Sequence, residues 1–235
     1  MIKVEYIDVW GFQHAIRGMR NPMNSWNRSD SHMELILRHD DEHAHIDAVI
    51  GPNDLDLMKR LYKAGHPHRK YLRQIMVSMD IIAPLYWWKE FDTYKVGTTA
   101  NSCSTMHKIM SKPFELNDFS YEHVWDLEDH VTQNIALKWW EDLINGLNYW
   151  RDKYLVAKKI DNILDSDDES LPPAKVVWWQ VIQMLPSSYN QKRTVTMNYE
   201  NIMNMLDYRD PHKLDEWNDF CSTLKTLPYI EEIRS

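Results

Sequence analysis

Glycine and cysteine are both scarce in this sequence of 235 residues, and each scarcity narrows the classes of protein to consider. The chain has six glycines and contains neither Gly-x-Gly-x-x-Gly nor Gly-x-x-x-x-Gly-Lys, so a Rossmann or P-loop nucleotide site is not expected. The two cysteines, Cys103 and Cys221, are too few for a disulfide framework. Because such frameworks belong to oxidising compartments, we expect a cytoplasmic protein.

Long hydrophobic runs are also missing. No stretch approaches the roughly 18 apolar residues of a membrane span, and the first five residues carry charge where a secretory signal would have an apolar core. We therefore expect no membrane partner. The net charge of −8 argues against non-specific binding to a nucleic-acid polymer, although it leaves room for a local basic pocket that binds a small anion.

Apolar and aromatic residues are plentiful: 43% of the chain is hydrophobic, with 11 Trp and 12 Tyr. This content is enough for a substantial core, and we expect one domain over residues 1–235, with irregular acidic segments near 110–130 and 160–172. Alternating and helical periodicities occur together, which predicts the α/β (α+β) class. The expected strands are 1–10, 33–37, 69–82 and 193–198.

Several helices are expected from caps and apolar spacing. Asn53 is a good N-cap and Gly65 a good stop, and Ala83-Pro84 is expected to open an aromatic helix. Asp210-Pro211 is expected to open the last helix. The remaining helices are expected at 12–20, 136–154, from Pro172-Pro173 onward, and at 200–207. The tryptophans of 136–154 predict burial between layers or against another subunit.

The segment His39-Asp40-Asp41-Glu42-His43-Ala44-His45 is the most metal-like in the chain. On a strand its histidines would share one face, which suits a metal. A solvated turn between two strands explains the same residues equally well. No paired His-x-x-Glu or Cys-x-x-Cys follows downstream, so we predict no metal site, and a metal-dependent enzyme is the weakest hypothesis.

The segment 83–107 combines an aromatic anchor with a small polar loop, and the elements around it follow a recognisable order. A helix stop at Gly65-His66, a strand, the Ala83-Pro84 helix, the polar loop and a long helix precede Leu185-Pro186, a strand ending at Asn198 and Arg209. This order resembles the flavin-dependent thymidylate synthases (ThyX) over about residues 50–108 and 174–220.

The family's motifs are matched more in spacing than in identity. Thr93-Tyr94-Lys95 stands where the family has Arg-His-Arg, Cys103 stands seven residues later at the Ser position, and Lys89-Glu90 replaces Arg-Gln. In the second half, Lys192 lies near a nucleotide-facing Arg position and Asn198 at a flavin-contacting Asn. Asp207-Tyr208-Arg209 matches Asn-Leu-Arg, whose Arg holds the uracil.

The resemblance implies a ThyX-like fold, with a central antiparallel or mixed sheet flanked by long helices, and a role in dTMP biosynthesis as a methyltransferase. It implies a flavoprotein homotetramer that binds FAD and dUMP or a related pyrimidine nucleotide, with NADPH and methylenetetrahydrofolate as co-substrates. Arg209 is the implied catalytic residue, polarising the pyrimidine. The implied substrate-binding residues are Glu90, Ser102, Cys103, Ser104, Lys192 and Arg209, and the implied cofactor-binding residues are His66, Thr93, Tyr94, Lys95, Val96, Asn101 and Asn198.

The departures from the motif support a second hypothesis. Thr93 and Tyr94 replace cationic or hydrogen-bonding residues beside the flavin, and Glu90 adds negative charge near an anionic substrate. Tyr94 still offers a ring that can stack on an isoalloxazine or a base. The alternative is a catalytically lapsed protein of the same fold that acts as a nucleotide-binding or protein-interaction module.

The two cysteines are expected to be structural. A nucleophilic Cys103 would need a base, which His107 would supply if the two shared a helical turn. We favour the alternative that Cys103 is a small residue packed in a tight loop. Cys221 lies on an apolar helical stripe and is expected in the core.

Overall fold

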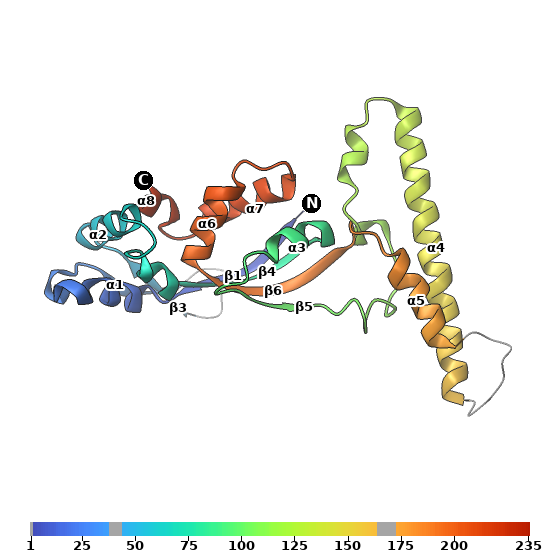
Figure 1. The fold of residues 1–235 in the computed structure, drawn as a ribbon, viewed down its shortest axis with the longest axis horizontal. Coiled ribbons are helices and arrows are strands. Elements are labelled where there is room, and N and C mark those ends of the chain that lie inside the picture. Colours follow the sequence, from blue (N-terminus) through green and yellow to red (C-terminus); the bar gives the residue numbers. More distant parts are fainter. Residues whose placement is uncertain (1, 38–43, 164–172) are drawn as a thin grey trace. The chain divides into compact units, whose positions relative to one another are not determined.

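The computed structural model describes residues 2–37, 44–163 and 173–235, which form two compact units (Figure 1). The sheet unit contains residues 2–81, 91–101 and 193–235. The hairpin unit contains residues 82–90 and 102–192. Helices and strands are mixed throughout, which confirms the α/β (α+β) prediction. No helix in the described part of the chain is both long and apolar enough to cross a membrane.

A four-stranded sheet of order β1-β4-β6-β5 gives the sheet unit its core. Its strands are β1 (Lys3–Trp10), β4 (Met76–Pro84), β6 (Asn190–Asn198) and β5 (Thr99–Ser102). Along β4 the side chains alternate as the sequence predicts, with Val77, Met79 and Ile81 buried. Residues 69–74 were expected to belong to this strand, and this is wrong, because Lys70–Gln74 form a 3₁₀ helix, η3.

A separate antiparallel pair joins β2 (His32–Leu37) to β3 (Ala44–Val49), with His32 opposite Val49. The last two residues of the metal-like segment, Ala44 and His45, begin β3. The segment's residues 39–43 are outside the described residues, so the choice of a solvated turn over a metal site stays a prediction. Among the residues that the structure describes, no cluster of three or more His, Cys, Asp or Glu is placed to hold a metal ion.

The helices near the N-terminus follow the predicted periodicity. The first, α1 (Phe12–Arg20), has the predicted bounds, and α2 (Pro52–Lys63) ends before Gly65, whose φ is +91°. The prediction that Asn53 caps α2 is wrong. The carboxylate of Asp30 instead accepts hydrogen bonds from the backbone N–H groups of Asn53 at 2.8 Å and Asp54 at 3.1 Å.

The C-terminal part of the sheet unit consists of α6 (Tyr199–Arg209), α7 (Asp215–Lys225) and α8 (Ile230–Arg234). The expectation that Asp210-Pro211 opens a helix is wrong, because α7 starts only at Asp215. His212 and Asn218 hold the intervening segment: the His212 N–H donates to Asn218 Oδ1 at 2.9 Å, and Asn218 Nδ2 donates to the His212 carbonyl at 3.0 Å. Cys221 is fully buried, as predicted.

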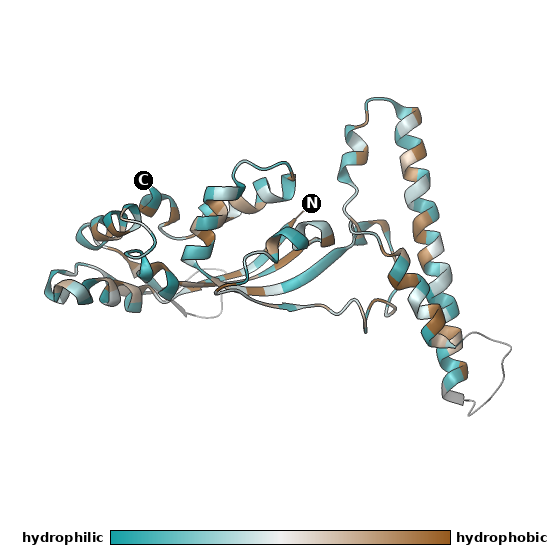
Figure 2. Ribbon diagram, viewed as in Figure 1, coloured by the Kyte–Doolittle hydropathy of each residue, from teal (hydrophilic) through white to brown (hydrophobic). Residues whose placement is uncertain are grey.

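In the hairpin unit, α4 (His130–Ile163) and α5 (Ala174–Met184) pack side by side (Figure 1). Apolar bands interrupt the polar surface of α4 in Figure 2. Leu147 and Val181 are fully buried between the helices, whereas Trp139 is 72% exposed, so the predicted burial of the tryptophan stripe holds only in part. The aromatic helix α3 (Leu85–Phe91) starts one residue after Pro84, because Pro84 ends β4 instead of opening the helix.

Short 3₁₀ segments complete the described chain. Two of them lie in the acidic region that was expected to be irregular, and two follow α1. They are η1 (Asn21–Met23), η2 (Trp26–Arg28), η4 (Leu116–Asp118) and η5 (Glu122–Asp126).

Candidate functional site

The loop between α3 and β5 is fixed to the start of α6. Asn198 is the N-cap of α6, and its side-chain oxygen accepts a hydrogen bond from the Asn201 N–H at 3.1 Å. The Asn201 amide then donates to the Val96 carbonyl at 2.9 Å and to the Thr98 hydroxyl at 2.8 Å. A helix cap and a loop that are far apart in sequence are thus joined, with Val96 itself 88% exposed.

Gly97 allows this close approach. Its φ is +74°, and a Cβ at this position would lie 2.5 Å from Asn198 Nδ2. A side chain here would therefore be strained and would also clash with the cap. Val96 and Asn198, two residues implied to bind cofactor, are linked through Gly97, which lies against Asn198, and through Asn201, and residues 95–97 are exposed beside them.

Arg209, at the last turn of α6, is held by three side chains. Its Nε donates to Tyr94 Oη at 3.1 Å, and one terminal nitrogen lies 3.2 Å from His212 Nε2. The guanidinium also lies 5.0 Å from the centre of the Trp217 ring and 5.7 Å from that of Tyr94. Trp217 is fully buried and stacks on Phe91, so the aromatic base under Arg209 is rigid.

This arrangement preorganises a planar cation. Arg209 remains half-buried, so its guanidinium is neither sequestered in the core nor left to move in solvent. A fixed guanidinium presents parallel N–H donors to a carbonyl, carboxylate or phosphate oxygen. The sequence signals Arg209 and Tyr94, but His212 and the partnership with Trp217 were missed. The only sequence signal for His212 is its spacing of three residues from Arg209.

Farther back along α6, Glu200 gathers three basic side chains from the segment 65–73. His66 Nδ1 lies 2.8 Å from Glu200 Oε1, Arg69 Nε donates to the same oxygen at 3.2 Å, and Arg73 Nε donates to Oε2. A terminal nitrogen of Arg73 lies 2.8 Å from His66 Nε2. The carboxylate is 7% exposed, whereas His66 and Arg73 are 66% and 40% exposed.

The charge balance of this cluster fixes the state of Glu200. Burial opposes ionisation, but hydrogen bonding to Arg73 and the charges of Arg73, His66 and Arg69 outweigh it and lower the pKa of Glu200. The same hydrogen bond to Glu200 raises the pKa of Arg73. An ionised carboxylate thus anchors three basic side chains, of which His66 and Arg73 face solvent while Arg69 is 15% exposed, and this arrangement suits the recognition of an anion.

Sequence reasoning identified His66 but missed Glu200 and Arg69. Two features of the sequence could have indicated them. Glu200 is the one acidic residue among the apolar and neutral polar residues of 195–206, and Arg69 and Arg73 are four residues apart. Within the sheet unit, α6 therefore links the predicted residues Asn198 and Arg209 with the cluster that holds His66.

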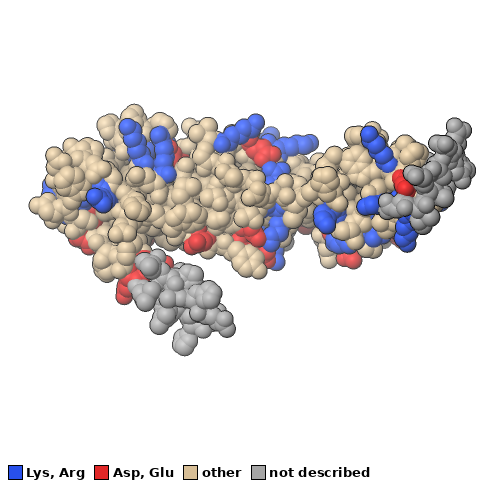
Figure 3. Space-filling view, turned by 90° about the horizontal axis from the view of Figure 1, so that it is seen from below, with Lys and Arg blue, Asp and Glu red and all other residues tan. Residues whose placement is uncertain are grey.

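The other implied residues of the sheet unit are exposed. Thr93 and Lys95 flank Tyr94 on the loop, and Asn101 lies on β5. On the face in Figure 3, basic and acidic side chains are interspersed and do not form one continuous basic surface. Their roles stay predictions.

The remaining implied residues lie in the hairpin unit. Cys103 is joined to the start of β6 through two hydrogen bonds: its N–H donates to the Lys192 carbonyl at 2.9 Å, and Gln191 Nε2 donates to its carbonyl at 2.9 Å. The Cys103 side chain is exposed, so the expectation that it is packed in a tight loop is wrong. The two hydrogen bonds hold the Cys103 backbone in place, so its position does not depend on packing of the side chain.

No helical turn joins Cys103 to His107. Turns occupy residues 105–107, and the His107 N–H donates to Ser104 Oγ at 3.1 Å. Ser102 ends β5, and Glu90 is half-buried near the end of α3. Of the implied substrate-binding residues, the structure brings Cys103 and Lys192 together through their backbones.

Known structures share this architecture. One is a crystal structure of thymidylate synthase X (ThyX) from Helicobacter pylori with FAD and dUMP, at 13% identity and a TM-score of 0.59, covering 100% of this chain and 97% of the other. Another, flavin-dependent thymidylate synthase ThyX from Helicobacter pylori complexed with FAD and dUMP, gives 15% identity and a TM-score of 0.60, covering 99% and 97%.

The chain therefore has a ThyX-like fold over its whole length, which confirms the predicted fold class. Its sequence matches no protein-family model and no curated protein. At 13–15% identity the likeness is one of fold, so the residues themselves must carry any functional argument.

Proposed function

We propose that this protein binds FAD and a pyrimidine nucleotide, dUMP or a related one, and acts as a flavin-dependent thymidylate synthase-type methyltransferase. The observation that carries the proposal is the preorganised Arg209, held by Tyr94, His212 and Trp217 at the end of the helix that Asn198 caps. The ThyX-like fold supports it, since both neighbours described above were crystallised with FAD and dUMP.

The residues of the sheet unit fit a flavin cofactor. Gly97 lets the loop approach the cap of α6, because a Cβ there would lie 2.5 Å from Asn198 Nδ2, and we propose that the flavin lies beside this loop. Arg73, 40% exposed, offers a guanidinium to a pyrophosphate beside His66, whose two ring nitrogens lie against Glu200 and Arg73. The further candidates for contact are Thr93, Tyr94, Lys95, Val96 and Asn101. When bound, FAD would supply hydride chemistry, with NADPH as reductant and methylenetetrahydrofolate as one-carbon donor.

For the nucleotide, we propose that Arg209 donates to a pyrimidine carbonyl, where negative charge develops as the ring is activated. The Arg209 Nε donates to the Tyr94 hydroxyl and one terminal nitrogen lies 3.2 Å from His212 Nε2, and we propose that the substrate meets the guanidinium at its terminal nitrogens. Lys192, Glu90, Ser102, Cys103 and Ser104 remain the proposed substrate-binding residues of the hairpin unit. We also propose a cytoplasmic homotetramer.

A second function is favoured by the loop sequence. Thr93 and Tyr94 replace two basic residues of the family's motif, and the Tyr94 hydroxyl is engaged with Arg209. Loss of those charge-assisted hydrogen bonds weakens flavin binding. The alternative is therefore a nucleotide-binding or protein-interaction module of the same fold without turnover.

The test begins with the purified protein. A yellow preparation that releases FAD on denaturation, and a higher melting temperature on adding FAD and dUMP, support ligand binding. Formation of dTMP from dUMP, NADPH and methylenetetrahydrofolate supports the enzyme, while binding without product supports the module. A colourless protein that neither ligand stabilises would dismiss the enzyme and the nucleotide-binding module and would leave the protein-interaction module.

A further inference from the structure

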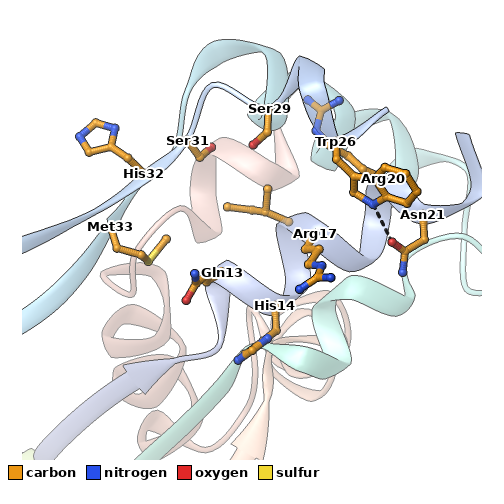
Figure 4. Close-up of a pocket in the computed structure, with 11 residues that line it drawn as sticks. Gln13, His14, Arg17, Arg20, Asn21, Trp26, Ser29, Ser31, His32 and Met33 are labelled. Atoms are coloured by element: carbon orange, nitrogen blue, oxygen red, sulfur yellow. Dashed lines mark hydrogen bonds between the residues drawn. The ribbon is translucent and has the colours of Figure 1, made fainter. Parts of the chain in front are cut away.

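A groove beside α1 shares no lining residue with the candidate functional site described above. Its volume is about 540 Å³, within the range of roughly 300–1,000 Å³ typical of small-molecule sites. One wall comes from α1 and the residue after it, and the other from the segment leading into β2 (Figure 4). The lining residues are Gln13, His14, Ile16, Arg17, Arg20, Asn21, Trp26, Ser29, Ser31, His32 and Met33.

The groove is basic in an acidic protein. It is lined by two arginines and two histidines but by no Asp or Glu, although the chain carries a net charge of −8. Arg20 is committed elsewhere, because its buried Nε donates to Asp54 Oδ1 at 2.6 Å. The side chains of Arg17, His14 and His32 make no hydrogen bond or ion pair with any described residue. Three basic groups are thus available to an anion.

The groove also has a fixed aromatic surface. Trp26 is 49% exposed, and its indole N–H donates to Asn21 Oδ1 at 2.8 Å (Figure 4). This hydrogen bond orients the ring while leaving much of it uncovered. An exposed indole held in one orientation is a stacking surface for a planar ring, and stacking on it costs little side-chain entropy.

The base of the groove is rigid. Asp54 is fully buried, and its Oδ2 accepts hydrogen bonds from the hydroxyls of Ser29 and Ser31, both at 2.7 Å. Together with the Arg20 pair, these bonds tie the segment before β2 to α1 and α2. The two walls therefore keep their spacing without a ligand, which favours binding because little ordering remains to be done.

We propose that this groove is a second ligand site, for a nucleoside monophosphate. The base would stack on Trp26, and the phosphate would accept hydrogen bonds from Arg17 with help from His14 and His32. A free phosphate would use only the basic groups, and a neutral nucleoside only the indole. The combination of both in one groove is what selects a planar ligand that carries an anion.

The probe is adenosine monophosphate, whose purine offers a large stacking surface, titrated calorimetrically into the Arg209→Ala protein to remove the first nucleotide site. We expect binding, at least tenfold weaker in Arg17→Ala and weaker again at raised salt. Trp26→Leu should weaken binding by several fold. Arg28→Ala removes an equal charge from an exposed neighbour that does not line the groove, and should change affinity by less than twofold.

Three results would overturn the proposal. The first is no binding of adenosine monophosphate to the Arg209→Ala protein. The second is inorganic phosphate binding as tightly as the nucleotide, which would remove the role of Trp26. The third is equal affinity in Arg17→Ala and Arg28→Ala, which would mean general charge attraction. None of these results bears on FAD or dUMP binding by the wild-type protein.

Discussion

Arg209 and Tyr94 meet through a hydrogen bond of 3.1 Å between the guanidinium Nε and the phenol oxygen, although 115 positions separate them in sequence. The same guanidinium lies over the Tyr94 and Trp217 rings. One loop residue and one helix residue thereby form a single unit, in which the tyrosine sets the direction of the arginine's remaining donors.

Tyr94→Phe tests this unit. Removing the hydroxyl leaves the ring contact but frees Nε, so we expect the dissociation constant for dUMP to rise about 3- to 10-fold, the usual worth of one hydrogen bond. Tyr208→Phe is the control, because Tyr208 adjoins Arg209 in sequence and is 78% exposed. Titration of each protein measures the effect, and equal affinities would mean that Tyr94 does not position Arg209.

Glu200→Gln tests the basic cluster. At pH 7 we expect a loss of about 1–3 kcal/mol in the free energy of unfolding, because the charge-assisted bonds to Arg69 and Arg73 weaken. The folded pKa of Glu200 is below its ordinary value of 4.5, so its stabilisation is fully present above that value. It is lost as the pH falls through the folded pKa.

Denaturant unfolding at pH 7 and near pH 3 therefore tests the direction in which the stability difference between the two proteins changes with pH. The difference between wild type and Glu200→Gln should shrink as the pH falls below 4.5, because the unfolded chain then takes up a proton that the folded carboxylate, with its lowered pKa, resists. A difference that stays constant or grows on acidification would contradict the charge assignment.

Asp54→Asn tests the buried ion pair under the α1 groove. Asp54 is fully buried and paired with Arg20, so neutralising it should cost about 3–5 kcal/mol of stability. Asp56→Asn is a matched control on the same helix, since Asp56 pairs with Arg60 in solvent and should cost about 0.5 kcal/mol or less. Chemical denaturation compares them, and similar losses would refute the structural role of Asp54.

Gly97→Ala and Gly65→Ala separate strain from steric clash. Both glycines have positive φ, so each alanine should cost about 1–2 kcal/mol. Only at Gly97 does the new Cβ meet Asn198, whereas nothing lies within 4 Å of the Cβ at Gly65. We expect Gly97→Ala alone to weaken FAD binding, by tenfold or more, and equal FAD affinity in both variants would argue against a cofactor beside Gly97.

Local signals in the sequence predicted much of the fold. Apolar spacing gave the bounds of α1, and alternation gave the buried face of β4. The predictions failed where a residue distant in sequence makes the contact that a neighbouring residue was expected to make. Asn53 was predicted to cap α2, but the carboxylate of Asp30 caps it instead. A contact between residues 23 positions apart cannot be recognised from the few residues around a helix start.

The candidate site was predictable only in part, for the same reason. Arg209 and Asn198 stand out through motif spacing, but Trp217 reads as ordinary core and becomes a site residue only when α7 packs under Arg209. Glu200 becomes a hub only when residues 65–73 lie against α6. Cys103 was predicted to be a packed loop residue, but it pairs with the start of β6 and its side chain is exposed.

The most direct test of the proposed function is titration of dUMP into the FAD-treated protein, with wild type and Arg209→Ala side by side. The account predicts that both proteins retain FAD, that wild type binds dUMP, and that Arg209→Ala binds it at least 100-fold more weakly, the higher end for a charge-assisted contact. A protein that retains no FAD, or an Arg209→Ala variant with wild-type affinity for dUMP, would contradict it.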